Sequence, residues 1–137
     1  MCLSIALKRP DLVLETGEHL GYEYAVTHNG KGYRCGYVRV PAGHPFYGLN
    51  RHALDVEIHG SVTFAEADVP CEKEGDDTSW WIGFDCAHAL DAPDPELLAP
   101  QLSDGIPPCP LWYGEEVRSA DYVRSECYSL CRQAAAA

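Results

Sequence analysis

One stretch near the middle of the chain decides the fold: residues 80–88 read Trp-Trp-Ile-Gly-Phe-Asp-Cys-Ala-His. A short apolar run that ends in polar residues is typical of a buried strand. This strand would carry Asp85, Cys86 and His88 at its C-terminal end. A second segment, residues 54–60, also ends in a His-Gly pair. We therefore expect the two ends to meet and to bring His59 close to His88.

The segments around this stretch predict further strands. Residues 21–27 and 33–40 are rich in Tyr and Val, and the turn between them contains Asn29-Gly30, a pair that favours hairpins. Residues 54–58, 61–65 and 79–84 are expected as three more strands. Residues 89–110 contain six prolines, which predicts a long loop with at most a short helix near residues 95–98.

The C-terminal segment is expected to form a helix that covers the sheet. Ser119 is a suitable N-cap, and Asp121 lies in the first turn, where the helix dipole favours a carboxylate. Apolar residues follow at steps of three and four, at Ala120, Val123, Cys127, Leu130, Cys131 and Ala134. The prediction is a single α+β domain over residues 1–137, with an antiparallel sheet of about five strands, a C-terminal helix packed on it and long Pro-rich loops.

The charge of the chain is unevenly distributed. Its net charge is −11, and residues 55–104 hold thirteen acidic residues and one basic residue, Lys73. Such a field repels nucleic acid and attracts basic surfaces. One interpretation is solubility, and the other is a surface that competes with nucleic acid for a basic partner. The residues expected to form that surface are Glu66, Asp68, Glu72, Glu74, Asp76 and Asp77.

Several classes of protein find no support in the sequence. No apolar run reaches the 18 residues of a membrane span. The first apolar run precedes Lys8-Arg9, the reverse of a secretory signal, so we expect a cytoplasmic protein with mostly reduced cysteines. A phosphate loop, a GxSxG motif and a basic patch are all missing, which removes support for ATP binding, esterase chemistry and direct nucleic-acid binding.

The polar end of the central strand allows several kinds of chemistry. His59, Cys86 and His88 are possible zinc ligands, although the paired CxxC or HxxxH spacing of strong zinc motifs is missing. Alternatively, Cys86 is a nucleophile with His59 or His88 as base and Asp85 as orienting group. The acidic surroundings oppose this second arrangement, because they disfavour a thiolate.

Two further interpretations of the same residues stay open. In a structural interpretation, Cys86 lies in the core, while Asp85 and His88 bind loop backbone and fix the turn after the strand. In a ligand-binding interpretation, His44, His59, Asp85 and His88 contact polar groups of a small, nucleotide-like ligand. One of the two adjacent tryptophans would then stack on that ligand, because neighbouring residues of a strand point to opposite faces.

Three blocks of the sequence resemble a group of small proteins encoded by bacteriophages and prophages. These blocks are residues 36–45, 55–64 and 80–88, and the group shares a Val-Pro-Gly-His-Pro loop, a His-Gly-Gly turn and a Gly-Phe-Asp-Cys-Ala-His block. The resemblance covers residues 33–91 and the final helix, and it implies no agreed activity. This chain departs from the pattern at Ser61 and at Leu90, where the group has glycine.

The resemblance and the charge together lead to two hypotheses on function. A phage-type origin implies a non-enzymatic inhibitor of a host defence effector of the CRISPR type, acting in the cytoplasm of the infected or lysogenic host. Its partner would be the basic surface of a host protein or nucleoprotein. The alternative is a small metal- or nucleotide-ligand-binding protein, or a hydrolase, with its site at His59, Asp85, Cys86 and His88.

Overall fold

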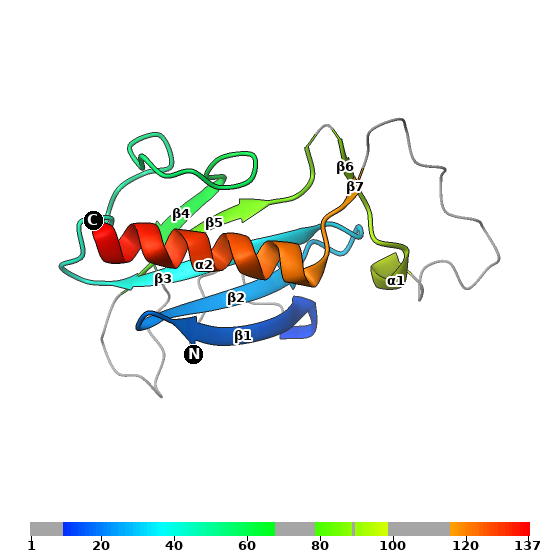
Figure 1. Ribbon diagram of the computed structural model, residues 1–137, viewed down its shortest axis with the longest axis horizontal. Helices are drawn as coiled ribbons and strands as arrows, with labels where there is room; N and C mark the ends of the chain where they lie inside the picture. The colour runs from blue at the N-terminus through cyan, green and yellow to red at the C-terminus, as the bar shows by residue number, and fades with distance from the viewer. Residues whose placement is uncertain (1–9, 68–78, 89, 99–115) are drawn as a thin grey trace.

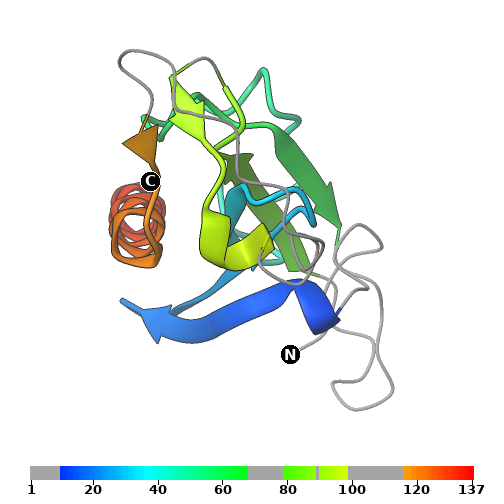
Figure 2. The same cartoon turned by 90° about the vertical axis from the view of Figure 1, so that its right-hand side faces the viewer.

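A computed structural model describes residues 10–67, 79–88, 90–98 and 116–137 of the chain. Five strands form one sheet in the order β1-β2-β3-β5-β4, in which all neighbours are antiparallel. A 17-residue helix, α2 (Ala120–Ala136), lies against one face of this sheet (Figures 1 and 2). The predicted α+β class, with about five antiparallel strands and a C-terminal helix, is confirmed. The strands are β1 (Val13–His19), β2 (Tyr22–His28), β3 (Arg34–Pro41), β4 (Phe64–Ala67) and β5 (Ser79–Asp85).

Two consecutive hairpins build the first half of the sheet. The predicted hairpin over residues 21–40 is formed by β2 and β3, and its turn is held by Asn29, whose Oδ1 accepts hydrogen bonds from the backbone N–H of Lys31 (2.8 Å) and of Tyr33 (3.3 Å). A second hairpin joins β1 to β2 through Leu20 and Gly21, which both have positive φ. The sequence had left the structure of this N-terminal segment open.

The decisive apolar stretch forms β5, which lies between β3 and β4 in the sheet. Ile82 pairs with Val38 of β3 and with Ala65 of β4, and it is fully buried. The adjacent tryptophans point to opposite faces, as expected for a strand. The indole N–H of Trp80 donates to the carbonyl oxygen of Leu49 at 3.0 Å, and Trp81 is fully buried on the other face.

Helix α2 covers the sheet with the stripe that its sequence predicts. The hydroxyl of Ser119 accepts a hydrogen bond from the Tyr122 backbone N–H and caps the helix. The helix packs mainly against β2 and β3. Its buried residues are Val123, Cys127, Leu130, Cys131 and Ala134, and they share one core with Val26, Val38, Ile82 and Phe84.

The prediction of a strand over residues 54–58 is wrong. This segment belongs to no strand, and Glu57 within it pairs with α2. The Gln133 side chain accepts from the Glu57 backbone N–H and donates to the Glu57 carbonyl oxygen, each at 2.8 Å. The sheet position beside β5 is occupied by β4, which begins at Phe64 and not at residue 61 as predicted.

A second, very small sheet leads from the end of β5 to the start of α2. Strand β6 (Asp91–Ala92) runs parallel to β7 (Glu116–Val117), which directly precedes the helix. The sequence predicted only a loop here, together with a short helix that corresponds to α1 (Pro95–Leu98). Most of the expected Pro-rich loop lies outside the described residues. No helix in the described part of the chain is long and apolar enough to cross a membrane.

Candidate functional site

Asp91 is the centre of a polar cluster at the end of the sheet. Its side chain is 1 % exposed, and its Oδ2 accepts hydrogen bonds from His59 Nε2 (2.9 Å) and from the His88 backbone N–H (3.0 Å). Its Oδ1 accepts from Arg118 Nε at 2.8 Å. Burial alone would raise the pKa of Asp91, but the hydrogen bonds from Arg118, His59 and the His88 backbone outweigh it and lower the pKa to about 2. Asp91 is therefore ionised at neutral pH.

His59 is held at both of its ring nitrogens. Nε2 contacts Asp91, and Nδ1 lies 2.7 Å from the hydroxyl oxygen of Tyr122, in the first turn of α2. The Tyr122 hydroxyl also lies 3.3 Å from Oε1 of Glu126, one helical turn further along α2. The His59 side chain is 13 % exposed. The helix therefore fixes both the position and the orientation of this imidazole.

His88 packs against the backbone of Gly60. A Cβ atom at residue 60 would collide with the His88 ring, and Gly60 has a φ of +70°, which also favours glycine. The His88 Nδ1 lies 3.3 Å from Asp91 Oδ2, and its Nε2 lies 3.6 Å from Asp85 Oδ1. The side chain is 35 % exposed, so among His59, His88 and Asp91 it is the one most open to solvent.

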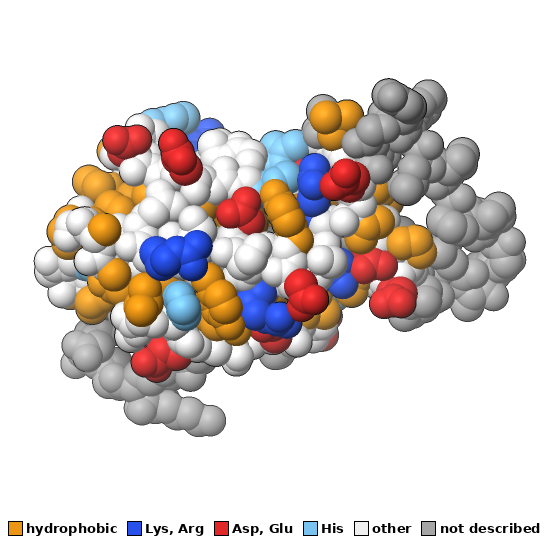
Figure 3. All heavy atoms as spheres, viewed as in Figure 1, with side chains coloured by type: hydrophobic (Ala, Val, Ile, Leu, Met, Phe, Trp, Pro, Cys, Tyr) orange, Lys and Arg blue, Asp and Glu red, His pale blue; other side chains and the backbone are white. Residues whose placement is uncertain are grey.

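Three segments of the chain meet at this site. His59 comes from the loop before β4, and His88 and Asp91 come from the turn after β5 and from β6. Arg118 lies between β7 and α2, and Tyr122 lies in the first turn of α2. The pairing of β6 with β7 brings Asp91 beside the residues that lead into the helix. Figure 3 shows histidine side chains at the surface beside basic and acidic groups, above the start of α2.

Three side chains of this cluster offer ligand atoms of the kinds that metal ions bind. One ligand atom from each of His59, His88 and Asp91 lies within 4.8 Å of the other two. Histidine nitrogens and carboxylate oxygens are common zinc ligands, with bonds of about 2.0–2.2 Å. Behind these atoms lie the polar partners that orient metal ligands in proteins, here Tyr122, Asp85 and Arg118.

The structure brings together only part of the residues that the sequence suggested. His59 and His88 meet, with ring centroids 5.7 Å apart, and Asp85 lies beside His88. His44 lies elsewhere, where its Nε2 donates to the Ala134 carbonyl oxygen at the C-terminal end of α2 (2.9 Å). Its Nδ1 accepts from the Phe46 backbone N–H at 3.0 Å, so His44 joins a loop to the helix end.

Cys86 is a core residue in this structure. It is 1 % exposed, and among the residues described it is not part of the close group of ligand atoms. Burial, followed by the nearby charge of Asp91, raises the pKa of the Cys86 thiol to about 12. A thiolate at this position is therefore strongly disfavoured at neutral pH.

Sequence reasoning missed Asp91, Arg118 and Tyr122. Asp91 is separated from Arg118 by 27 positions, and the two strands that align them have two residues each. Such short strands leave no periodic pattern in a sequence. One signal for two of them was available. Arg118 and Tyr122 flank the predicted N-cap of α2, and a helix that packs on a sheet begins near an end of that sheet, where the site was expected.

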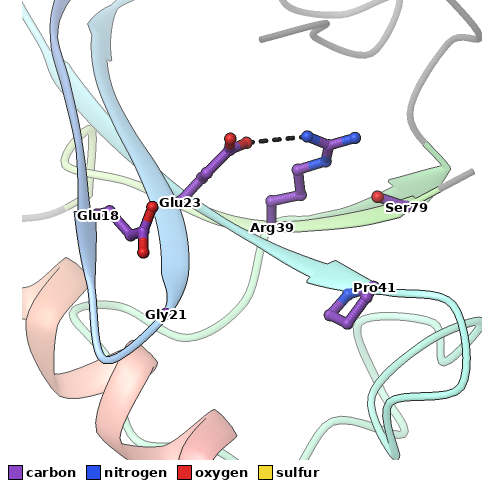
Figure 4. Close-up of a pocket in the computed structure, with 6 residues that line it drawn as sticks. All are labelled: Glu18, Gly21, Glu23, Arg39, Pro41 and Ser79. Carbon is purple, nitrogen blue, oxygen red and sulfur yellow. Dashed lines mark hydrogen bonds and ion pairs between the residues drawn. The ribbon is translucent and has the colours of Figure 1, made fainter. Parts of the chain in front are cut away.

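A separate pocket lies on the other face of the sheet. It is lined by Glu18, Gly21, Glu23, Arg39, Pro41 and Ser79 (Figure 4). Arg39 Nη1 donates to Glu23 Oε2 at 2.9 Å across it. The pocket shares no residue with the histidine cluster, so it is not part of the candidate site.

Of the six acidic residues expected to form a partner surface, only Glu66 lies in the described part, exposed on β4. Asp68, Glu72, Glu74, Asp76 and Asp77 lie outside the described residues. The face seen in Figure 3 mixes acidic and basic side chains. Comparison of the chain with protein-family models, with curated proteins and with solved structures finds no match.

Proposed function

We propose that this chain binds a divalent transition-metal ion of the zinc class through His59, His88 and Asp91. The observation that carries the proposal is the convergence of three ligand atoms within 4.8 Å of one another, from two segments of the chain that lie far apart in the sequence. Asp91 is already ionised, because its hydrogen bonds hold its pKa well below neutral pH. The carboxylate therefore needs to lose no proton before it binds a cation.

The donor set favours zinc over calcium or magnesium. Two imidazole nitrogens and one carboxylate oxygen suit Zn²⁺ and its neighbours in the first transition series, whereas Ca²⁺ and Mg²⁺ prefer shells of oxygen. Arg118 remains on the second oxygen of Asp91, 2.8 Å away, and would keep that carboxylate oriented. Three protein ligands leave one tetrahedral position for water, which is the arrangement of zinc sites that activate water for hydrolysis.

The experiment is a metal titration of the purified chain after treatment with a chelator. We expect one Zn²⁺ or Co²⁺ ion per chain, measured by calorimetry and by the visible absorption of bound Co²⁺. His88→Ala should abolish binding with little loss of fold, because the His88 side chain is 35 % exposed. His52→Ala is the matched control, since His52 is exposed in the loop that precedes the site. A wild-type chain that binds neither ion, or a His88→Ala variant that binds like the wild type, would rule the proposal out.

The charge distribution supports a second candidate function, inhibition of a basic effector by an acidic surface. Its motivation is that residues 55–104 contain thirteen acidic residues and only one basic residue. Binding to such a partner should weaken steeply with salt. Neutralising Asp76 and Asp77 should weaken it while leaving metal binding intact, and His88→Ala should do the reverse. Salt-insensitive binding would contradict this function.

A further inference from the structure

We infer that Arg34 is a positioning residue for the proposed metal site, because its side chain joins the two segments that carry Asp91 and Arg118. The inference rests on the proposed function and names a residue outside the cluster that fixes the geometry of the cluster. Arg34 is the first residue of β3, and its side chain is 10 % exposed. Within the described part of the chain, its guanidinium contacts Asp94 and Arg118 and none of the three proposed ligands.

One nitrogen of the Arg34 guanidinium binds both segments. Nη1 lies 2.7 Å from Asp94 Oδ2, and it donates to the Arg118 carbonyl oxygen at 3.1 Å. Asp94 follows the proposed ligand Asp91 by three positions, and Arg118 donates from its own Nε to Asp91 Oδ1 at 2.8 Å. The two hydrogens of Nη1 therefore hold together the segments whose side chains form the Asp91–Arg118 pair.

The small β6–β7 sheet needs such a connection. Each of its strands contributes two residues, and the Glu116 backbone N–H adds one hydrogen bond to the Leu90 carbonyl oxygen at 2.9 Å. A pair of isolated strands is at best marginally stable in water. Arg34 ties this pair to the five-stranded sheet, together with the Asp94 backbone N–H, which donates to the Gly32 carbonyl oxygen at 2.8 Å.

The backbone of Arg34 fixes the turn that carries His88. Its carbonyl oxygen accepts a hydrogen bond from the Cys86 backbone N–H at 2.9 Å, directly after β5 ends. A substitution of Arg34 leaves this backbone bond in place and changes only the side-chain contacts. The segment of His88 should therefore stay where it is, while Arg118 is free to shift and to turn the Asp91 carboxylate away from the metal position.

The test compares Zn²⁺ affinities of full-length variants, by competition with a chromophoric chelator. Arg34→Met/Asp94→Leu replaces the nearly buried ion pair with apolar side chains, an exchange that often leaves stability unchanged. It should weaken Zn²⁺ binding by about 10-fold or more, the usual effect of losing a residue that orients a metal ligand. Arg34→Lys keeps a charge for Asp94, but its shorter, unbranched side chain cannot also reach Arg118, so it should weaken binding similarly. Arg39→Met/Glu23→Leu is the matched control, because it removes another ion pair of β3 outside the cluster, and it should bind Zn²⁺ like the wild type.

The visible absorption of bound Co²⁺ separates positioning from a general loss of stability. At saturating Co²⁺, a turned Asp91 carboxylate should change the spectrum of both Arg34 variants, whereas a merely structural role would leave it as in the wild type. Wild-type affinity in Arg34→Lys, weaker binding with an unchanged spectrum, or an equal loss in the Arg39→Met/Glu23→Leu control would each overturn the inference and leave the proposed function in place. A wild-type chain that binds no metal would overturn both.

Discussion

Ser61 and Leu90 have backbone conformations that are unusual for their residue types. Their φ angles are +87° and +74°, in the left-handed region that favours glycine. Ser61 follows Gly60, which packs against the His88 ring, and Leu90 precedes Asp91, so both turns border the cluster of His59, His88 and Asp91. These are also the two positions at which the resemblance to phage-encoded proteins predicts glycine. The turns keep a glycine-type conformation without the glycine, and this conformation stores strain beside the site.

Replacing Leu90 with glycine should therefore stabilise the protein. The left-handed conformation costs a residue with a Cβ about 1–2 kcal/mol, and the entropy of an added glycine cancels about 0.5–1 kcal/mol of the gain. The Leu90 side chain is 56 % exposed, so little burial is lost. We expect Leu90→Gly to raise the free energy of unfolding by about 0.5 kcal/mol, measured by urea denaturation. Leu90→Ala keeps the strain and is the control, and a gain from alanine as large as that from glycine would contradict the explanation.

Replacing Gly60 with alanine should have the opposite effect. A Cβ at this position would collide with the His88 ring, and the φ of +70° would be strained. We expect the free energy of unfolding to fall by about 1–3 kcal/mol, with the His88 ring displaced from Asp91. The displacement should also weaken Zn²⁺ binding, measured by competition with a chromophoric chelator. Alanine at Gly43, which also has positive φ but open space around its Cα, separates backbone strain from the collision with His88. A Gly60→Ala protein with unchanged metal affinity would show that the close approach of His88 is not required.

At the scale of elements, the packing of α2 on the sheet depends on Gly36 in β3. A Cβ at Gly36 would lie 2.8 Å from Cys127 Sγ in α2 and would also meet the Phe84 ring of β5. Gly36 therefore allows a helix and a neighbouring strand to pack over the same position. We expect Gly36→Ala to reduce the free energy of unfolding by about 1–3 kcal/mol through overpacking. Adding Cys127→Ala to the Gly36→Ala protein should recover part of the lost free energy of unfolding, because the smaller side chain leaves room for the new Cβ. If the effects of the two substitutions simply add, the two residues do not share this contact.

The elements that sequence reasoning predicted are those that local patterns determine. The hairpin over residues 21–40, the apolar strand β5 and the capped, striped helix α2 each follow from turn residues or periodicity within one segment. Residues 54–58 have a strand-like pattern, but their backbone pairs with the Gln133 side chain, 76 positions away. A segment that pairs with a strand and one that pairs with a helix side chain can show the same pattern of apolar and polar residues. The pattern indicates which side chains are buried, but it does not identify the hydrogen-bond partner.

The candidate site was predictable to a similar extent. Its two histidines follow from the ends of apolar segments, and the structure brings their rings together. Asp91 and Arg118 were not predictable, because they meet through two-residue strands joined by a long intervening segment. His44 was misplaced for the same reason, since its role depends on where the far end of α2 lies. Side chains that depend on non-local pairing leave no signal in their own segment.

At the scale of the whole molecule, α2 connects the sheet, the loop before β4 and the β6–β7 pair. Its first turn carries Tyr122, which contacts His59, and Gln133 near its end holds the backbone of Glu57. Between them, Arg124 binds Glu15 of the edge strand β1 through two hydrogen bonds of 2.7 Å. The helix therefore holds both the loop before β4 and the edge strand β1, and its contacts with β1 include this ion pair and the stacked rings of His19 and Tyr128.

This ion pair predicts how stability changes with pH. The hydrogen bonds from Arg124 lower the pKa of Glu15 below its ordinary value of 4.5, against a smaller opposing effect of burial. A carboxylate whose pKa is lowered by folding stabilises the folded state above its unfolded-state pKa, and this contribution is lost as the pH falls through the folded-state pKa. The wild type should therefore be more stable than Glu15→Gln at pH 7, and the difference should narrow steadily between pH 4.5 and pH 3. Urea denaturation of both proteins across this range measures it.

Glu18→Gln provides the comparison for that experiment, because Glu18 lies on the same strand with an exposed side chain. Its difference in stability from the wild type should be small, as expected for substitution of an exposed side chain. Adding salt should reduce the Glu15 effect only partly, since the two hydrogen bonds to Arg124 are short and the Glu15 side chain is 25 % exposed. A Glu15→Gln protein whose stability deficit stays constant down to pH 3 would show that the glutamate acts through packing and not through its charge. The connection between α2 and β1 would then depend on packing, through contacts such as the stacked rings of His19 and Tyr128.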